Sequence, residues 1–257
     1  MTSFLEQSND DTASSAAIAV GKLPDVEQAV TFKLPPSRCE YRLDQQSQFE
    51  CEFAPHIQPA DYMRRLQTGW RRFGPVVFRP DCGNCQSCLS SRVPVATFRP
   101  SETQRRTWRR NAGSVELRIG PPIVTAERAA LFARFHEHGH QSKGWPLTDP
   151  GHLALYVANP FPTEEWSYWV DGRLVGVGYV DPLPEGLSAV YFFHDPADHR
   201  RSLGTFNILT MMDAARQRGL PHVYLGYYVE GCRSLEYKAR FGPNEVLHDG
   251  RWQPFVR

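Results

Sequence analysis

The sequence lacks long apolar runs, a large net charge and internal repeats. No apolar run approaches the roughly 20 residues that a membrane-spanning helix needs, and the stretch at residues 16–20 is too short for the core of a signal peptide. We therefore expect a soluble cytoplasmic protein with no membrane partner. The formal net charge of the 257 residues is +1, so any contact with nucleic acid has to come from a local basic patch.

The composition is that of an ordinary globular protein, with 41% hydrophobic and 22% charged residues. A chain of this length forms one large domain or two modest ones and buries a sizeable core. Residues 1–25 are polar and rich in Ser and Asp, and we expect them to be disordered. In a reducing compartment, metal binding, a redox role or burial is a better expectation for the six cysteines than disulfides.

Residues 26–110 contain five of the six cysteines and many turn residues, which indicates a small cysteine-containing N-terminal domain. Asp61 is the expected N-cap of a helix over residues 61–70, because its carboxylate can accept from free backbone N–H groups. The apolar residues at 75–80 predict a short strand.

Residues 111–257 carry the pattern of a mixed α/β sheet. Asp171 and Gly172 join two apolar runs, which is a strong hairpin pattern. Antiparallel strands followed by a strand–helix–strand–helix run predict an acyltransferase-like α/β (α+β mixed) fold. The expected strands cover residues 167–170, 174–180, 189–194, 222–228 and 246–252, and the expected helices cover 126–138, 203–218 and 232–240.

Cys82, Cys85 and Cys88 follow one another at two-residue spacing, which lets thiolates converge on one metal ion. Cys39 or Cys51 would complete four ligands for Zn²⁺ or an iron–sulfur cluster. The alternative is that the cysteines are reduced and simply packed in a small domain.

His136, His138 and His140 occupy every second position of an expected helix. Alternate residues of a helix do not share a face. We therefore expect a solvated helix end here rather than a metal site.

Two clusters combine arginines with an aromatic side chain. Arg71 and Arg72 follow Trp70. The second cluster is a basic helix that begins with a capping-box pattern at residues 101–104, in which Trp108 is surrounded by Arg105, Arg106, Arg109 and Arg110. Arginine grips phosphates, and an indole stacks on unpaired bases, as in proteins that bind single-stranded RNA ends. The alternative is a solvated helix face. We favour RNA or substrate contact for the second cluster.

A series of short motifs follows one another from about residue 37 to the C-terminus. In chain order they are Cys39-Glu40-Tyr41, residues 69–74, Phe78-Arg79-Pro80, the three spaced cysteines, residues 100–106, Arg110-Asn111, Asp195-Pro196, Ser202-Leu203-Gly204, residues 224–228, Cys232, Tyr237-Lys238 and Phe241. Together these motifs resemble the arginyl-tRNA–protein transferase family. They are most similar to its bacterial branch, which transfers leucine to proteins beginning with aspartate or glutamate.

The resemblance implies a GNAT-like acyltransferase domain, residues 111–257, preceded by the cysteine-containing domain, residues 26–110. It implies that leucine moves from leucyl-tRNA to the N-terminal Asp or Glu of an acceptor protein, which the new N-terminal leucine marks for degradation by the N-degron pathway. Eukaryotic members transfer arginine, and their differently spaced cysteines hold an iron–sulfur cluster.

One departure separates the chain from acetyl-CoA enzymes. Those enzymes begin a helix with R/Q-x-x-G-x-G/A, where bare backbone amides bind pyrophosphate. Here Phe206 stands at the last position of the corresponding segment, 201–206. We expect its side chain to crowd the pyrophosphate, which argues against acetyl-CoA as the donor.

The chemistry needs no cofactor, because an aminoacyl ester is already activated. The acceptor amine has an ordinary pKa of about 7.7–8.0, so orientation and oxyanion stabilisation can supply most of the rate. We hypothesise that Ser202 and Gly204 offer N–H groups to the terminal adenosine or the oxyanion. Asp195 would orient the acceptor ammonium or accept its proton. The side chains expected to line the groove where ester and amine meet are Tyr227, Tyr228, Tyr237 and Lys238.

An acidic acceptor side chain needs a cation, and the sequence offers Arg71, Arg72, Arg79 and Lys238. Three other functions remain open at this stage. The first is transfer of arginine, for which an acidic pocket would be expected instead of an apolar one. The second is a non-catalytic tRNA-binding or redox-sensing module, and the third is a small-molecule N-acetyltransferase.

Overall fold

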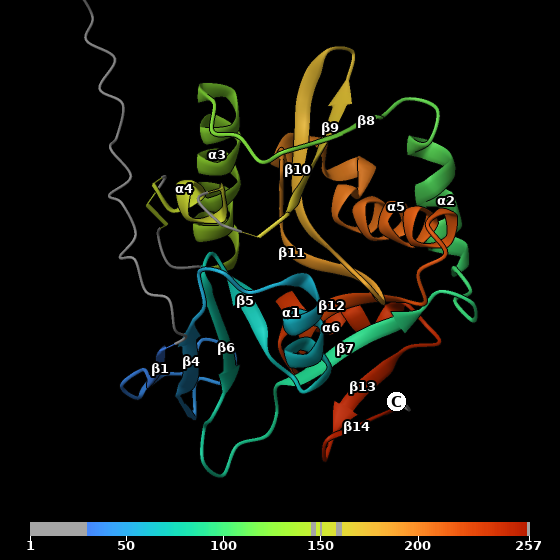
Figure 1. The fold of residues 1–257 in the computed structure, drawn as a ribbon. Coiled ribbons are helices and arrows are strands. Elements are labelled where there is room, and N and C mark those ends of the chain that lie inside the picture. Colours follow the sequence, from blue (N-terminus) through green and yellow to red (C-terminus); the bar gives the residue numbers. More distant parts are fainter. Residues whose placement is uncertain (1–29, 145–147, 150, 158–160, 256–257) are drawn as a thin grey trace, which may run out of the picture.

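The protein has a mixed α/β fold, as predicted. Its described residues form an eight-stranded, a four-stranded and a two-stranded sheet, with helices on both faces of the largest (Figure 1). The computed structural model describes residues 30–144, 148–149, 151–157 and 161–255, so the disorder expected for residues 1–25 lies outside the described part. No helix within these ranges is long and apolar enough to cross a membrane.

The smaller sheet is antiparallel, with the strand order β1-β4-β6-β5. Its strands are β1 (Val30–Lys33), β4 (Phe49–Phe53), β6 (Val76–Pro80) and β5 (Arg71–Phe73), and β2 (Ser37–Arg38) pairs with β3 (Gln46–Ser47) beside it. The strand expected at 75–80 is confirmed as β6.

Helix α1 (Pro59–Gln67) differs from the expected helix at both ends. Pro59 occupies the first turn, where a missing N–H does no harm, and Asp61 forms an ion pair with Arg64 instead of capping the helix. The helix ends before Gly69, whose φ of +92° suits glycine. The chain then turns into β5, which the sequence analysis missed.

The larger sheet has eight strands, in the order β14-β13-β7-β12-β11-β10-β9-β8. Strand β7 comes from the cysteine-containing region, so both regions of the chain contribute to one sheet. The bounds are β7 (Leu89–Pro94), β8 (Glu116–Gly120), β9 (Glu164–Val170), β10 (Arg173–Leu183), β11 (Gly186–His194), β12 (His222–Tyr228), β13 (Glu245–His248) and β14 (Arg251–Pro254).

Two Asp-Gly pairs make the tight hairpins of this sheet. Asp171 and Gly172 have φ values of 47° and 77° between β9 and β10, which confirms the predicted hairpin. Asp249 and Gly250, with φ values of 49° and 72°, join β13 to β14. The single strand expected over 246–252 is therefore wrong, because this turn folds the segment back on itself.

Helices cover the two faces of the larger sheet (Figure 1). Helices α2 (Glu102–Asn111) and α5 (Leu203–Gln217) pack together on one face, and α3 (Ala126–Lys143) and α4 (His152–Val157) pack on the other. The capping box of α2 is confirmed by reciprocal hydrogen bonds between Ser101 and Gln104. The short α6 (Arg233–Glu236) and the 3-10 helices η1 (Pro196–Arg201) and η2 (Tyr237–Arg240) complete the chain.

Strands β11 and β12 pair in parallel for only three residues, 186–188 with 222–224. Beyond that point β12 continues against β7, with a register shift between Tyr224 and Gly226. The two strands therefore separate from Ala189 onward, which leaves backbone carbonyl groups on both sides of a gap in the sheet.

A buried ion pair fastens the smaller sheet to the larger one. Arg72 of β5 donates to both carboxylate oxygens of Asp181 in β10, at 2.6 and 3.1 Å, and both side chains are at most 1% exposed. Thr163 donates to the same carboxylate. Burying an unpaired charge is costly, so each of the two charges offsets the desolvation cost of the other.

Replacing Arg72 with Met should cost roughly 3–5 kcal/mol of unfolding free energy, because Asp181 would be left buried without a counter-charge. Urea denaturation measures the loss. The matched control is Lys33→Met, which breaks an exposed ion pair with Asp81 and should have little effect. A loss for Arg72→Met as small as that of the control would contradict the role of this pair.

Candidate functional site

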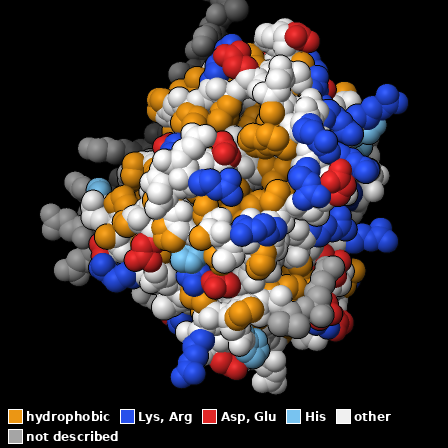
Figure 2. Space-filling model, turned by 90° about the vertical axis from the view of Figure 1, so that its right-hand side faces the viewer, with side chains coloured by type: hydrophobic (Ala, Val, Ile, Leu, Met, Phe, Trp, Pro, Cys, Tyr) orange, Lys and Arg blue, Asp and Glu red, His pale blue; other side chains and the backbone are white. Residues whose placement is uncertain are grey.

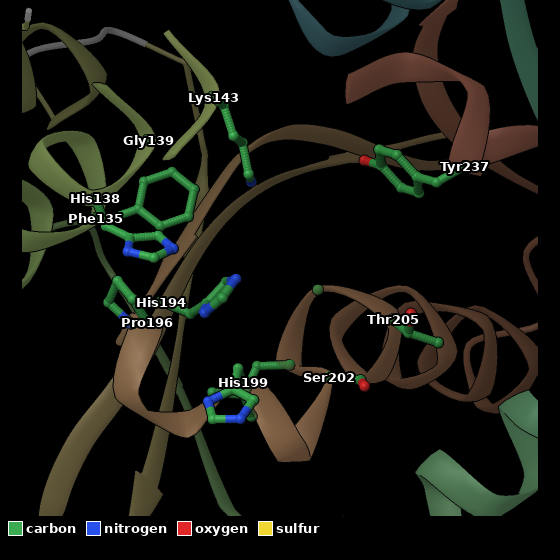
Figure 3. A pocket seen from close by; sticks show the side chains of 12 residues that line it. Phe135, His138, Gly139, Lys143, His194, Pro196, His199, Ser202, Thr205 and Tyr237 are labelled. Carbon is green, nitrogen blue, oxygen red and sulfur yellow. The ribbon is translucent and has the colours of Figure 1, made fainter. Parts of the chain in front are cut away.

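A cavity of about 390 Å³ lies where β11 ends and α5 begins. Figure 3 shows Lys143 of α3 and Tyr237 of η2 reaching toward this space from opposite sides. We call it the α5 pocket. Its lining residues are Phe135, His138, Gly139, Lys143, His194, Pro196, His199, Ser202, Leu203, Gly204, Thr205 and Tyr237.

The start of α5 gives the α5 pocket free backbone donors. Ser202 adopts a left-handed φ of 52° at the N-cap, and its side chain makes no capping hydrogen bond. A Cβ at Gly204 would meet nothing within 4 Å, so the backbone there is bare. The first amides of a helix have no intrahelical partner, and the helix dipole adds partial positive charge. The N–H of Gly204 thus lies where a donor was expected, whereas the N–H of Ser202 already donates to the carbonyl of His199 at 3.1 Å.

The expected crowding by Phe206 is wrong. Its side chain is 4% exposed and packs in the core against Trp108 and Tyr168, facing away from the pocket. The reason is helical geometry, since Phe206 lies on the face of α5 that covers the sheet.

Three histidines that line the α5 pocket, His138, His194 and His199, were not predicted as site residues. Burial lowers the pKa of His194, which favours its neutral ring near pH 7. His138 belongs to the triplet that we expected at a solvated helix end, but α3 continues to Lys143. His136 of the same triplet is half-buried and hydrogen-bonded to Tyr191 at 2.7 Å. The only signal for His136 and His138 in the sequence was their spacing of two residues. That spacing does not tell which side of α3 packs against the rest of the protein.

Asp195 stands at the N-cap of η1. One carboxylate oxygen accepts from the backbone N–H of Ala197, and the other faces Arg134 and Arg173 at 3.4 and 3.1 Å. This carboxylate holds the turn that leads into the α5 pocket.

The predicted tyrosines take different positions. Tyr237 lines the α5 pocket and is 39% exposed. The hydroxyl of Tyr227 donates to the backbone of Gly69 at 2.9 Å, and Tyr228 is buried against Phe255. The structure therefore brings Tyr237 to the pocket, whereas Tyr227 and Tyr228 pack between elements.

Lys238 follows Tyr237 and is buried at the gap between β11 and β12. Its ammonium donates to the carbonyl of Tyr227 at 2.5 Å. Arg71, 8% exposed, donates to the carbonyl of Ala189 on the other side of the gap at 2.8 Å. Burial, and then the nearby charge of Arg71, lower the pKa of Lys238 from 10.5 to about 7.

The other two cations proposed for an acidic acceptor have acidic partners within the chain. Arg72 is paired with Asp181. Arg79 is paired with Glu50, and its guanidinium lies over the ring of Trp70, 4.8 Å from the centroid.

The cysteines gather around a second cavity, of about 200 Å³, which Cys39, Cys82, Cys85 and Cys88 all line. Cys51 lies in β4, outside this lining. Burial and the neighbouring thiols raise the pKa of Cys88 to about 12, whereas hydrogen bonds with Ser87 lower the pKa of Cys85. Over the described ranges, no group of three or more His, Cys, Asp or Glu side chains is arranged to hold a metal ion.

Helix α2 displays a basic surface. Arg105, Arg106 and Arg109 are each more than half exposed and share one carboxylate, that of Glu102. On the face toward which α2 and α5 lie, Lys and Arg side chains gather on one side (Figure 2). One carboxylate cannot neutralise three guanidinium groups, so this patch stays net positive.

The burial of Lys238 predicts a pH-dependent cost in stability. The pKa is about 7 in the folded protein and 10.5 in an unfolded chain, so unfolding takes up a proton between these values and stability rises with pH there. Replacing Lys238 with Met removes this cost. The melting temperature of the variant minus that of wild type should increase as the pH falls from about 10 to about 7. Below that pH the difference should stay constant. Scanning calorimetry across this range would contradict the burial of a charge if the difference did not vary.

Both parts of the chain match one known family. Residues 37–106 match the family described as "Arginine-tRNA-protein transferase, N terminus", and residues 127–248 match its "C terminus" counterpart.

Curated relatives agree with that match. The aspartate/glutamate leucyltransferase of Chromobacterium violaceum is 37% identical over 224 residues, which cover 86% of this chain and 92% of that one. The protein of the same name from Ruegeria pomeroyi is 41% identical over 190 residues, 73% and 69% of the two chains. Among solved structures, the C-terminal domain of a putative lysylphosphatidylglycerol synthetase from Agrobacterium fabrum has a TM-score of 0.46 and 15% identity over 65% of this chain and 58% of that one, too weak a likeness to support an argument. On the strength of the family match and these relatives, the chain belongs to the arginine-tRNA–protein transferase family, whose members are aminoacyltransferases.

Proposed function

We propose that this enzyme transfers leucine from leucyl-tRNA to the α-amine of proteins that begin with aspartate or glutamate. The observation that carries the choice of leucine is the lining of the α5 pocket. Its described residues include the apolar Phe135, Pro196 and Leu203 beside three histidines and a lysine, and none of these described residues is an Asp or Glu. An arginyl side chain would find no counter-charge among these described lining residues. The names of the curated relatives support the same choice of donor and acceptor.

The reaction is an aminolysis of an ester. The neutral α-amine attacks the carbonyl carbon of the leucyl ester, and a tetrahedral intermediate forms. The C–N bond is kept, the bond to the terminal ribose oxygen breaks, and the proton lost by the amine ends on that oxygen. The ester is already activated, so holding amine and ester in line and stabilising the oxyanion are the main requirements.

The α5 pocket supplies the groups that this step needs. The free amides at the start of α5, that of Gly204 among them, would donate to the oxyanion or to the terminal adenosine. His194, neutral near pH 7, and the partly exposed Tyr237 would border the ester. Asp195 would act by holding η1 in place, through its hydrogen bond to Ala197 and its two arginines.

We also propose that the larger sheet is of the GNAT type. The division into residues 26–110 and 111–257 stays a prediction, and the sheet built mainly by the second part includes strand β7 of the first. Two features support a GNAT-type sheet. The parallel strands β11 and β12 separate after residues 188 and 224, and α5 begins close to the end of β11.

The transfer step is proposed to need no cofactor. A zinc ion or an iron–sulfur cluster at Cys39, Cys82, Cys85 and Cys88 would require the sulfurs to rearrange, because no suitable group is formed over the described ranges. The thiols surround a common cavity, so these four are the residues that would hold such a group. No step of the proposed reaction passes through it.

The cellular location of the enzyme is inferred from its substrates. Charged tRNA is present in the cytoplasm, so we place the enzyme there. The product carries a new N-terminal leucine, and we propose that this residue marks the acceptor for degradation.

A transfer assay tests the proposal. Purified protein is mixed with radiolabelled leucyl-tRNA or arginyl-tRNA and with peptides that begin with Asp, Glu or Ala. We expect leucine on the Asp and Glu peptides only. Arginine transfer would change the donor assignment, and no transfer from either tRNA would leave a tRNA-binding or redox module as the better interpretation.

The basic patch of α2 should bind the RNA and not the peptide. Replacing Arg105 and Arg106 together with Gln removes two exposed charges from a net positive surface. We expect the KM for leucyl-tRNA to rise several-fold, with a weaker dependence of binding on salt. The KM for an Asp peptide should stay the same, and an equal rise in both would contradict an RNA-specific patch.

A further inference from the structure

Two buried cations beside the α5 pocket have no acidic partner. No ion pair joins Arg71 or Lys238 to a carboxylate within the described part of the chain, although the side chains are 8% and 6% exposed. The other two candidates are neutralised, Arg72 by Asp181 and Arg79 by Glu50.

The groups that face this pair do not supply the missing negative charge. Burial raises the pKa of Tyr62 and Tyr227 above the usual value, so both phenols are neutral near pH 7. Cys232 lies near enough to influence Lys238 electrostatically. The surroundings are thus phenols, thiols and backbone carbonyls.

Gly226 leaves room for one more atom between the cations. Its φ is +87°, and a Cβ built on it would lie 3.5 Å from Arg71 Nη2 and 3.5 Å from Lys238 Nζ. A carboxylate oxygen placed slightly closer would be within hydrogen-bonding distance of both nitrogens. The bare glycine backbone therefore faces a position that the Arg71 guanidinium and the Lys238 amino group share.

We propose that Arg71 and Lys238 together bind the side-chain carboxylate of the acceptor's N-terminal Asp or Glu. This assignment rests on the proposed function and specifies the acceptor side of the same site. Arg71 and Lys238 would thus determine the specificity for acidic acceptors. The side-chain carboxylate of the acceptor would supply the negative charge that the described residues around this pair do not provide.

A purely structural role explains less. Each cation makes one hydrogen bond to a carbonyl exposed by the separation of β11 and β12, Ala189 for Arg71 and Tyr227 for Lys238. A neutral donor would satisfy these carbonyls without the cost of burying a charge. Arginine has five N–H donors and an ammonium has three, so both retain donors for a ligand.

The position of the pair also suits the chemistry. Lys238 directly follows Tyr237, whose ring centroid is 6.0 Å from the ammonium and which lines the α5 pocket. In an N-terminal Asp or Glu, the α-amine and the side-chain carboxylate are separated by a few bonds only. A carboxylate held at Arg71 and Lys238 would therefore keep the amine at the edge of the pocket that receives the ester.

The test measures peptide binding without tRNA, so it is independent of catalysis. Short peptides with a C-terminal fluorophore and a free N-terminal Asp or Asn are titrated with wild-type protein, Arg71→Gln, Lys238→Met and the control Arg118→Gln. Arg118 is exposed on β8, at the far edge of the larger sheet. We expect the Asp peptide to bind wild type at least about tenfold more tightly than the Asn peptide. Either site variant should remove this preference, and the control should keep it.

Several outcomes would overturn the assignment. One is an equal loss of Asp and Asn binding in a variant whose circular dichroism is unchanged, because that indicates a structural role. Another is a weakening of leucyl-tRNA binding larger than that of peptide binding, which would move the cations to the donor side. If a variant fails to fold, the affinities of wild type for the Asp and Asn peptides decide. Equal affinities for the two peptides would contradict the assignment.

The transfer assay separates this assignment from the proposed function. Leucine transfer by wild type without an Asp preference in binding would overturn the assignment alone. Selective Asp binding without leucine transfer would leave the assignment standing and overturn the proposed reaction.

Discussion

The separation of β11 from β12 is the constraint on which the site depends. Parallel pairing satisfies the backbone of both strands over three residue pairs only. Past that point the carbonyls of Ala189 and Tyr227 need other donors, and buried backbone groups rarely stay unpaired. Arg71 and Lys238 provide those donors. The same divergence sets the end of β11 beside the start of α5, so the α5 pocket and the cation pair share one origin.

The buried pair Arg72–Asp181 and the neighbouring Arg71 and Lys238 have different electrostatic surroundings. Arg72 and Asp181 neutralise each other and join the two sheets. Arg71, the preceding residue in the chain, has no such partner among the described residues, and its charge lowers the pKa of Lys238. Successive residues of a strand point to opposite faces, so these neighbours meet different surroundings. Uncompensated charge in a folded protein is destabilising, and it commonly persists where a ligand supplies the compensation.

Local patterns in the sequence were sufficient wherever short-range geometry decides the structure. The Asp171-Gly172 hairpin, the Ser101–Gln104 capping box and the helix that ends before Gly219 all follow from turn and cap preferences, and all three are present. The same reasoning failed at Asp61, because Pro59 moved the helix start, and at Phe206, because the pattern did not state which face of α5 would be covered.

The sequence by itself determined the family, the mixed α/β class and a short set of cations for an acidic ligand, because ordered motifs and residue chemistry are local properties. Only the tertiary structure decided which cations are left without a carboxylate, that His138, His194 and His199 meet Tyr237 around one pocket, and that the four cysteines share one cavity. These relations join residues far apart in the chain, such as Arg71 and Lys238. Their charge balance depends on contacts that form only when the strands and helices pack together.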